Sequence, residues 1–331
     1  SSDVCSSDLR ISDRSLAVNR RFGSWMQALS AAVVLGLLGV AATCLADPNE
    51  DVGTAAFPTL KLGVGAATVG RGGAGIALSE DAYATYWNPA GLAHTRATHL
   101  ALMNNEWILD LRQNYAAFAH PLNDTTGLGV FVNYFDYGEI EGRDETGEPT
   151  GVFRPSDLAA GVGVGFAVND DLSIGVQGKI LRQEIDDASA SGFAVDAGIR
   201  YDIPDTPASV AATIQHLGTS MKFDTEGFSL PTTLRAGVGY RIADDTAALA
   251  LDIAMPTDDD IKVGAGISYE ILDPLVLRGG YRYDFGGADH GTVAGLTGGF
   301  GLLLGGFVID YAFVSLGDLG PSNRVSLSTA F

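Results

Sequence analysis

Residues 193–201 decide the fold: they read Phe193-Ala-Val-Asp-Ala-Gly-Ile-Arg-Tyr201. Apolar side chains occupy alternate positions from Phe193 to Tyr201, and Asp196 and Arg200 fall between them. A period of two is typical of a β-strand whose two faces meet different surroundings. We therefore expect a strand with one apolar face and one polar, charged face.

The same alternation recurs fourteen times between residue 95 and residue 331. Most of these segments have about 10–13 residues, more than the ~5–6 of a soluble strand and close to the 9–11 of a tilted membrane strand. The expected strands lie near residues 95–103, 112–121, 125–135, 156–169, 171–184, 192–203, 208–217, 231–243, 246–255, 260–271, 274–284, 291–303, 306–316 and 322–331.

The connections between these segments alternate in length. Those after even-numbered segments are short, such as 122–124 and 204–207, whereas 136–155 and 219–230 are long and carry acidic residues. Short turns at one end and long loops at the other are typical of bacterial outer-membrane barrels with an even strand number. The sequence thus predicts an all-β protein, a 14-stranded antiparallel transmembrane β-barrel at 95–331, with both termini in the periplasm.

A soluble secreted sandwich or propeller is the alternative, because its strands also alternate between a core face and a wet face. The length of the expected strands argues against a soluble fold, as do the charged residues on the strand faces opposite the apolar residues. The terminal aromatic residue also counts against it. Val325, Leu327 and Phe331 share one face of the last segment, and a strand ending on an aromatic residue resembles the signal that barrel-assembly machinery recognises.

The composition is glycine-rich and acidic. Gly supplies 43 of 331 residues, against a usual share of about 7%. We expect the runs 161–165, 237–239 and 264–266 to line the concave inner wall. Lys and Arg number 20 against 40 Asp and Glu, giving a net charge of −20. That balance argues against nucleic acid as a partner, because phosphate binding needs clustered cations.

Charged residues on the inner faces of the expected strands carry both signs. Such charges usually pair and brace a plug, whereas an open ion-selective pore favours one sign. The expected lumen charges are Lys179, Asp196, Arg200, Arg235, Arg241, Asp252, Lys262, Arg278, Arg282 and Asp310.

The first 46 residues differ from the rest of the chain. Arg20-Arg21 precede the apolar run 28–42, which ends in small residues up to Ala46. This order describes a secretory signal peptide preceded by a leader, with cleavage after Ala46. A lipoprotein site at Cys44 and an uncleaved anchor are alternatives. Cys5 and Cys44 are the two cysteines of the sequence, so a disulfide framework or cysteine metal site is not expected in the barrel.

Residues 47–94 contain three recognisable motifs: Leu60-Lys-Leu-Gly-Val-Gly65, Gly70-Arg-Gly-Gly-Ala74 and Asp81-Ala-Tyr-Ala-Thr-Tyr-Trp-Asn-Pro-Ala-Gly-Leu92. A phosphate-binding loop would need Lys-Ser/Thr after the glycines, and this sequence lacks that pair after Gly75. The motifs, and the ending at 323–328 with Phe331, resemble the PorV/PorQ family of the FadL-like superfamily. The resemblance implies a plug at 47–94, with Trp87, Asn88, Pro89 and Ala90 as its most specific element.

The resemblance implies a membrane protein without a cofactor or catalytic role. FadL-type members carry long-chain fatty acids or other hydrophobic molecules, and the PorV branch takes part in type IX secretion by binding the signal domains of secreted cargo. Protein export or surface assembly is our first expectation, hydrophobic transport the second and a structural, loop-presenting barrel the third. Expected partners are outer-membrane lipid, barrel-assembly machinery, and cargo proteins or a hydrophobic small molecule.

Two kinds of site chemistry remain open alternatives. The five histidines are scattered without metal-ligand spacing, so a metal or Ser-His site is weakly supported. The run Asp258-Asp259-Asp260 could hold Ca²⁺, since carboxylate oxygens suit that ion. A solvated acidic loop is the more ordinary interpretation.

Overall fold

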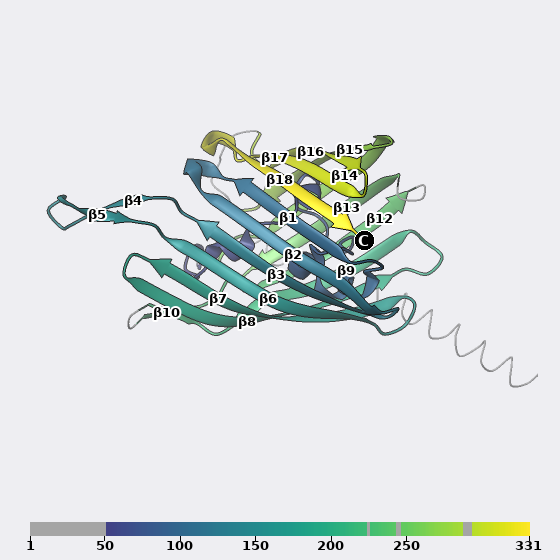
Figure 1. The fold of residues 1–331 in the computed structure, drawn as a ribbon, viewed down its shortest axis with the longest axis horizontal. Helices are drawn as coiled ribbons and strands as arrows, with labels where there is room; N and C mark the ends of the chain where they lie inside the picture. Colours follow the sequence, from purple (N-terminus) through teal and green to yellow (C-terminus); the bar gives the residue numbers. More distant parts are fainter. Residues whose placement is uncertain (1–50, 224–225, 243–245, 287–292) are drawn as a thin grey trace, which may run out of the picture. The chain divides into compact units, whose positions relative to one another are not determined.

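A closed barrel of fourteen antiparallel strands forms the body of the protein in a computed structural model (Figure 1). The structure describes residues 51–331 except 224–225, 243–245 and 287–292. The expected leader and signal peptide at 1–46 lie outside these residues. The barrel strands are β1 (His99–Glu106), β2 (Arg112–Asn123), β3 (Thr126–Asp136), β6 (Ser156–Ala167), β7 (Leu172–Ile185), β8 (Ala188–Asp202), β9 (Ala208–Gly218), β12 (Thr233–Ile242), β13 (Ala247–Pro256), β14 (Lys262–Leu272), β15 (Leu275–Asp284), β16 (Leu296–Leu304), β17 (Phe307–Ser315) and β18 (Pro321–Ala330).

Strand pairing confirms the barrel predicted from the alternation. Neighbours along the chain pair antiparallel, and β1 closes the circle on β18, with Leu102 opposite Leu327. The first strand begins at His99 rather than near residue 95. Thr95 instead ends the preceding 3-10 helix and is buried.

Two connections that we expected to be loops contain short hairpins. The connection between β3 and β6 holds β4 (Ile140–Arg143) and β5 (Pro149–Phe153), and Figure 1 shows this hairpin projecting beyond the barrel wall. The connection between β9 and β12 holds β10 (Met221–Phe223) and β11 (Glu226–Phe228). Both hairpins stand at the end of the barrel with the long connections, which we call the long-loop end; the opposite end is the short-turn end.

The outer face of the barrel is apolar, as the alternation predicts. Val176, Ile180 and Leu251 are 52%, 66% and 50% exposed. The neighbouring residues Gln177, Lys179 and Asp252 point inward and are buried. Apolar surface of this extent is costly in water, at about 25 cal/mol per Å². A hydrocarbon surrounding removes that cost, and a closed barrel leaves no strand edge unpaired within it. No helix in the described part of the chain is long and apolar enough to cross a bilayer.

Residues 51–98 precede β1 and are here called the interior segment. They form η1 (Pro58–Lys61), α2 (Ala66–Val69), α3 (Ala84–Trp87) and η2 (Pro89–His94). Their side chains and backbone bond to residues of β2, β6, β8, β9, β13, β16 and β18, around the whole circumference. A segment in contact with all these strands must lie inside the barrel.

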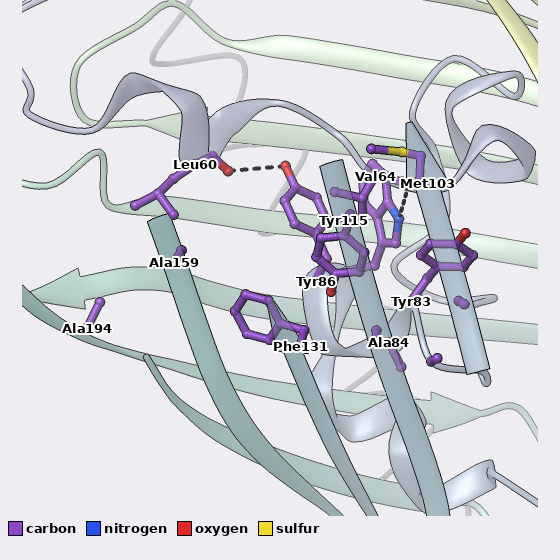
Figure 2. Close-up of a cluster of buried hydrophobic side chains, with 14 of the residues drawn as sticks. Leu60, Val64, Tyr83, Ala84, Tyr86, Met103, Tyr115, Phe131, Ala159 and Ala194 are labelled. Carbon is purple, nitrogen blue, oxygen red and sulfur yellow. Dashed lines mark hydrogen bonds between the residues drawn. The ribbon is translucent and has the colours of Figure 1, made fainter. Parts of the chain in front are cut away.

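The hydrophobic core lies between the interior segment and the inner wall (Figure 2). Tyr115 of β2 stacks between Tyr83 and Phe131, with ring centroids 6.0 and 5.6 Å away. The hydroxyl of Tyr86 donates to the carbonyl of Leu60 at 3.2 Å. The core therefore fills the barrel from within, while the outer face is left for lipid.

Candidate functional site

A row of glycines crosses four neighbouring strands on the inner wall. Gly127 of β3 is the register partner of Gly165 on β6, Gly165 is the partner of Gly175 on β7, and Gly175 is the partner of Gly198 on β8. Glycine weakens a strand and is used where another backbone approaches closely. The row forms a shallow trough with no side chains, into which the Asn-Pro-Ala motif fits.

The fit between this trough and the motif leaves no room for a methyl group. A Cβ added at Gly175 would come within 3.0 Å of the backbone of Pro89 and Ala90. At Gly198 it would clash with the side chain of Asn88, and at Gly127 with the carbonyl of Leu92. Gly165 of the predicted run 161–165 belongs to this row, which receives residues 88–93 of the interior segment.

Asn88 anchors the motif with a fully used side chain. Its Nδ2 donates to the carbonyls of Ile76 at 3.1 Å and Ile199 at 3.3 Å, and its Oδ1 accepts the amide of Ala90 at 3.0 Å. The residue is 0% exposed. Each of these bonds therefore replaces a hydrogen bond to water that the amide loses on burial. Trp87 beside it donates Nε1 to Val64 at 3.0 Å.

A second contact of small residues lies across the barrel. Gly266 of β14 is the register partner of Gly280 on β15, and a Cβ on either would clash with the backbone at Arg71 or Gly72. The amide of Gly72 donates to Thr297 Oγ1 at 2.9 Å. Gly72 has φ +74°, a left-handed conformation that glycine adopts without strain. The interior segment therefore packs closely against two separate parts of the barrel wall.

One buried charge cluster ties β7, β8 and β9. Lys179 Nζ lies 2.7 Å from Asp196 Oδ1 and 2.6 Å from His216 Nδ1, and the His216 amide donates to Asp196 Oδ1 at 2.7 Å. His216 has φ +61° where the register between β8 and β9 shifts. Such a bulge re-aims a side chain, and here it turns the imidazole of His216 inward, where it is buried.

A second cluster joins the wall to the interior segment. Asp252 Oδ2 accepts the amides of Gly75 at 2.6 Å and Ile76 at 3.0 Å. Arg278 Nη1 lies 2.7 Å from Asp310 Oδ1, with both side chains at most 8% exposed. Asp252 therefore binds the interior segment, whereas the pair of Arg278 and Asp310 joins β15 to β17 within the wall.

At the short-turn end, Glu80 of the interior segment bridges two wall arginines. Its Oε1 lies 2.6 Å from Arg200 Nη1 and 2.7 Å from Arg241 Nη2. Burial would raise the pKa of Glu80, but the two guanidiniums outweigh it, so the pKa lies below its usual value. His94 Nε2 lies 2.9 Å from Ser173 Oγ at the same rim. A cavity of about 670 Å³ with a mixed polar and apolar lining opens there.

At the long-loop end, the acidic run 258–260 pairs with lysines. Lys61 of the interior segment lies 2.8 Å from Asp258 and 3.0 Å from Asp259, and Lys262 lies 3.2 Å from Asp259. Among the described residues, no group of three or more His, Cys, Asp or Glu could hold a metal ion. These carboxylates therefore serve to fix the start of the interior segment to the rim.

The structure places all the predicted lumen charges on the inner face or its rim. Five are buried: Lys179, Asp196, Arg200, Asp252 and Asp310. The residues of the predicted assembly signal, Val325, Leu327 and Phe331, are 51%, 40% and 74% exposed.

Sequence reasoning missed at least four interior charges, which are Arg71, Glu80, Asp157 and Arg324. Arg71 and Glu80 lie in the irregular interior segment, where no periodicity marks them. Arg324 alternates with Val325 and Leu327 in β18 and is buried. The period of two could have identified Arg324.

Comparisons with known proteins agree with this geometry. The family model described as "Type IX secretion system protein PorV" matches residues 45–257. No curated protein matches the chain significantly. The solved structures described next are 12–16% identical to this chain, so their likeness shows the fold alone.

Three solved barrels illustrate the likeness. The Pseudomonas putida toluene transporter TodX has a TM-score of 0.60 at 14% identity, covering 81% of this chain and 99% of that one. The Ralstonia pickettii toluene transporter TbuX has a TM-score of 0.57 at 16% identity, with coverage of 81% and 98%. A Pseudomonas aeruginosa FadL homologue has a TM-score of 0.57 at 12% identity, with coverage of 81% and 98%.

The resemblance to PorV/PorQ proteins and to FadL-like barrels is thereby confirmed, and the fold and family together imply an outer-membrane protein. The family model spans more than half of the sequence. The chain belongs to the PorV family of type IX secretion system proteins.

Proposed function

We propose that this protein serves type IX protein export or surface assembly as a plugged outer-membrane barrel that works through its long-loop end. The interior segment is the plug, with Trp87, Asn88, Pro89 and Ala90 at its anchor point. The observation that carries the proposal is the filled interior: the cavity of about 670 Å³ lies at the short-turn rim, and two cavities deeper between the plug and the wall measure about 60 and 10 Å³. Neither of the two deeper cavities admits a polypeptide or a long acyl chain.

Many polar contacts fix the plug, so opening it would cost considerable free energy. Thr59 Oγ1 donates to Asp157 at 2.6 Å, Gln215 Nε2 donates to the carbonyl of Tyr86 at 2.6 Å, and the Ala66 amide donates to Ser326 Oγ at 2.8 Å. Removing one partner of a buried bond costs about 1–3 kcal/mol. A route through the lumen would break many of these bonds together.

The β4–β5 hairpin offers a surface for a protein partner. Ile140 and Val152 are 41% and 66% exposed on opposite faces of the hairpin, because Ile140 is the register partner of Phe153 and Val152 that of Glu141. Figure 1 shows the hairpin well clear of the wall. Exposed apolar residues with a polar surround are typical of interaction sites. In the orientation that we propose, short turns and both termini face the periplasm, so this hairpin faces the cell exterior.

Hydrophobic transport is the alternative function. The solved toluene transporters share the fold, and the bulge at His216 is the kind of wall irregularity that a lateral opening would use. Against it, the inner residues at this bulge are Lys179, Asp196 and His216, which disfavour an apolar ligand. A structural barrel that only presents its loops is the third possibility, and a specific protein partner would argue against it.

Replacing Ile140 and Val152 with Asp tests the proposal in the native host. We expect surface display of exported cargo to fall several-fold, because each face of the hairpin loses an exposed apolar contact. The barrel itself should keep its heat-modifiable migration on a gel. Glu145→Gln at the hairpin tip is the matched control. Unchanged display, together with reduced uptake of a hydrophobic substrate, would favour the transport alternative instead.

A further inference from the structure

Cations gather around one small cavity inside the barrel near the long-loop end. The cavity measures about 60 Å³ and lies beside Trp87 of the interior segment. A single carboxylate, that of Asp252, lines it. Its cationic lining residues are Lys61, Arg235, Lys262, Arg282 and Arg324.

Three of these cations have acidic partners at the rim. Lys61 pairs with Asp258 and Asp259, and Lys262 pairs with Asp259. Arg282 Nε lies 3.3 Å from Asp284 Oδ1. Their charge is thus compensated outside the cavity.

The other two arginines have no carboxylate partner in the described part of the chain. Arg324 is 4% exposed, and its Nη1 donates to Ser322 Oγ at 3.1 Å. Its Nε is buried without a hydrogen-bond acceptor among the described residues. Arg235 donates Nε to Gln215 Oε1 at 2.8 Å and stands over the Trp87 ring at 5.4 Å.

A buried guanidinium without an anion is costly. The desolvation penalty of one buried ion amounts to several kcal/mol, and a neutral acceptor such as Ser322 or Gln215 offsets part of it. A second cation nearby increases the penalty by repulsion. The buried Arg324 and the half-buried Arg235 on one cavity therefore favour a bound negative charge.

The cavity has the size and donor geometry for one anionic group. Guanidinium groups present planar donors that match carboxylate and phosphate oxygens. A cavity needs about 10–15 Å³ to hold one water molecule, so a cavity of about 60 Å³ has room for one small anionic group.

We propose that Arg235 and Arg324, with the Asp284-paired Arg282 at the edge, form an anion-binding site for one phosphate or carboxylate group entering from the long-loop end. The anion joins β12, β15 and β18 and, through Arg235 on Trp87, holds the interior segment in place. This site is independent of the export role. A free anion and a lipid headgroup share the required chemistry.

The test uses the full processed chain in detergent, with inorganic phosphate as the probe. At constant ionic strength, phosphate in tenfold excess over its Kd should raise the Tm by about 3 °C relative to chloride. Arg324→Gln and Arg235→Gln should each remove most of that shift. Arg182→Gln, an exposed arginine paired with Glu184, should keep it.

Further arms keep the proposal falsifiable. Arg324→Lys preserves the charge and should retain part of the shift even if Arg324→Gln fails to fold. Acetate and phosphatidylglycerol micelles, run in parallel, identify the source: protection by phosphate or acetate indicates a free anion, and protection by the lipid alone indicates a headgroup. Absence of protection by all three probes, or equal protection of wild type and both Gln variants, would overturn the proposal.

Discussion

Asn88 and Gly198 are in such close contact that a single methyl group on Gly198 would overlap the Asn88 side-chain oxygen. Asn88 belongs to the interior segment and Gly198 to the centre of β8. The neighbouring carbonyl of Ile199 accepts the Asn88 amide. The contact therefore couples the sequence motif of the interior segment to the glycine content of the wall.

Gly198→Ala is the direct test of that coupling. We expect a loss of about 1–3 kcal/mol in unfolding free energy, because overpacking a tight interior displaces its neighbours. Denaturant unfolding followed by tryptophan fluorescence measures it, since Trp87 lies next to Asn88. Gly279→Ala is the matched strand control, because a Cβ there meets nothing within 4 Å. Equal effects of the two variants would show that the glycine row has no packing role.

The buried pair of Arg278 and Asp310 should behave as a unit. Asp310→Asn or Arg278→Met alone should cost about 3–5 kcal/mol, because each leaves an uncompensated buried charge. The double variant should cost less than the sum of the two, which a double-mutant cycle on unfolding free energy measures. The exposed pair of Arg143 and Glu141 should give at most about 1 kcal/mol. Additive costs at Arg278 and Asp310 would contradict the pairing.

The Glu80 bridge predicts an acid-sensitive interior. Its folded-state pKa is lowered, so its stabilisation is fully present above the unfolded value of about 4.3 and is lost as the pH falls through the folded value. Wild type should therefore lose more stability than Glu80→Gln as the pH falls below about 4.3. Thermal unfolding of both proteins across this range is the measurement. Parallel profiles of stability against pH for the two proteins would show that Glu80 does not cause the acid sensitivity.

Phe331 is predicted to act in assembly rather than in stability. It is exposed, and its backbone pairs with Thr98 through two bonds of 3.0 Å, which any residue could make. Phe331→Ser should lower the amount of assembled barrel in the membrane several-fold. The Tm of the protein that does assemble should hardly change. Ala330→Ser is the control, and normal assembly of Phe331→Ser would reject the proposed signal.

The barrel was predictable because its physical cause is local. Alternation between lipid and interior acts on every second residue, so each strand shows it without knowledge of its neighbours. The β4–β5 hairpin has exposed residues on both faces and so gives no such signal. The start of β1 was misplaced for a similar reason, since residue 95 still belongs to the irregular segment.

The sequence predicted that charged residues inside the barrel would pair, but it did not identify their partners. Mixed charges on the inner face indicated pairing, yet Lys179 finds Asp196 only through the register of β7 and β8, and Glu80 finds Arg200 only through the path of the interior segment. The bulge at His216 has no signal in the local pattern. Contacts that depend on register or on an aperiodic chain need three-dimensional coordinates.

The central claim is that this barrel works through a protein partner and not through its lumen. Purification from the native outer membrane, followed by mass spectrometry for both protein and lipid, tests it most directly. The account predicts cargo or secretion proteins in stoichiometric amounts and no hydrophobic molecule retained within the barrel. A stoichiometric fatty acid or other hydrophobic ligand, recovered without any protein partner, would contradict it.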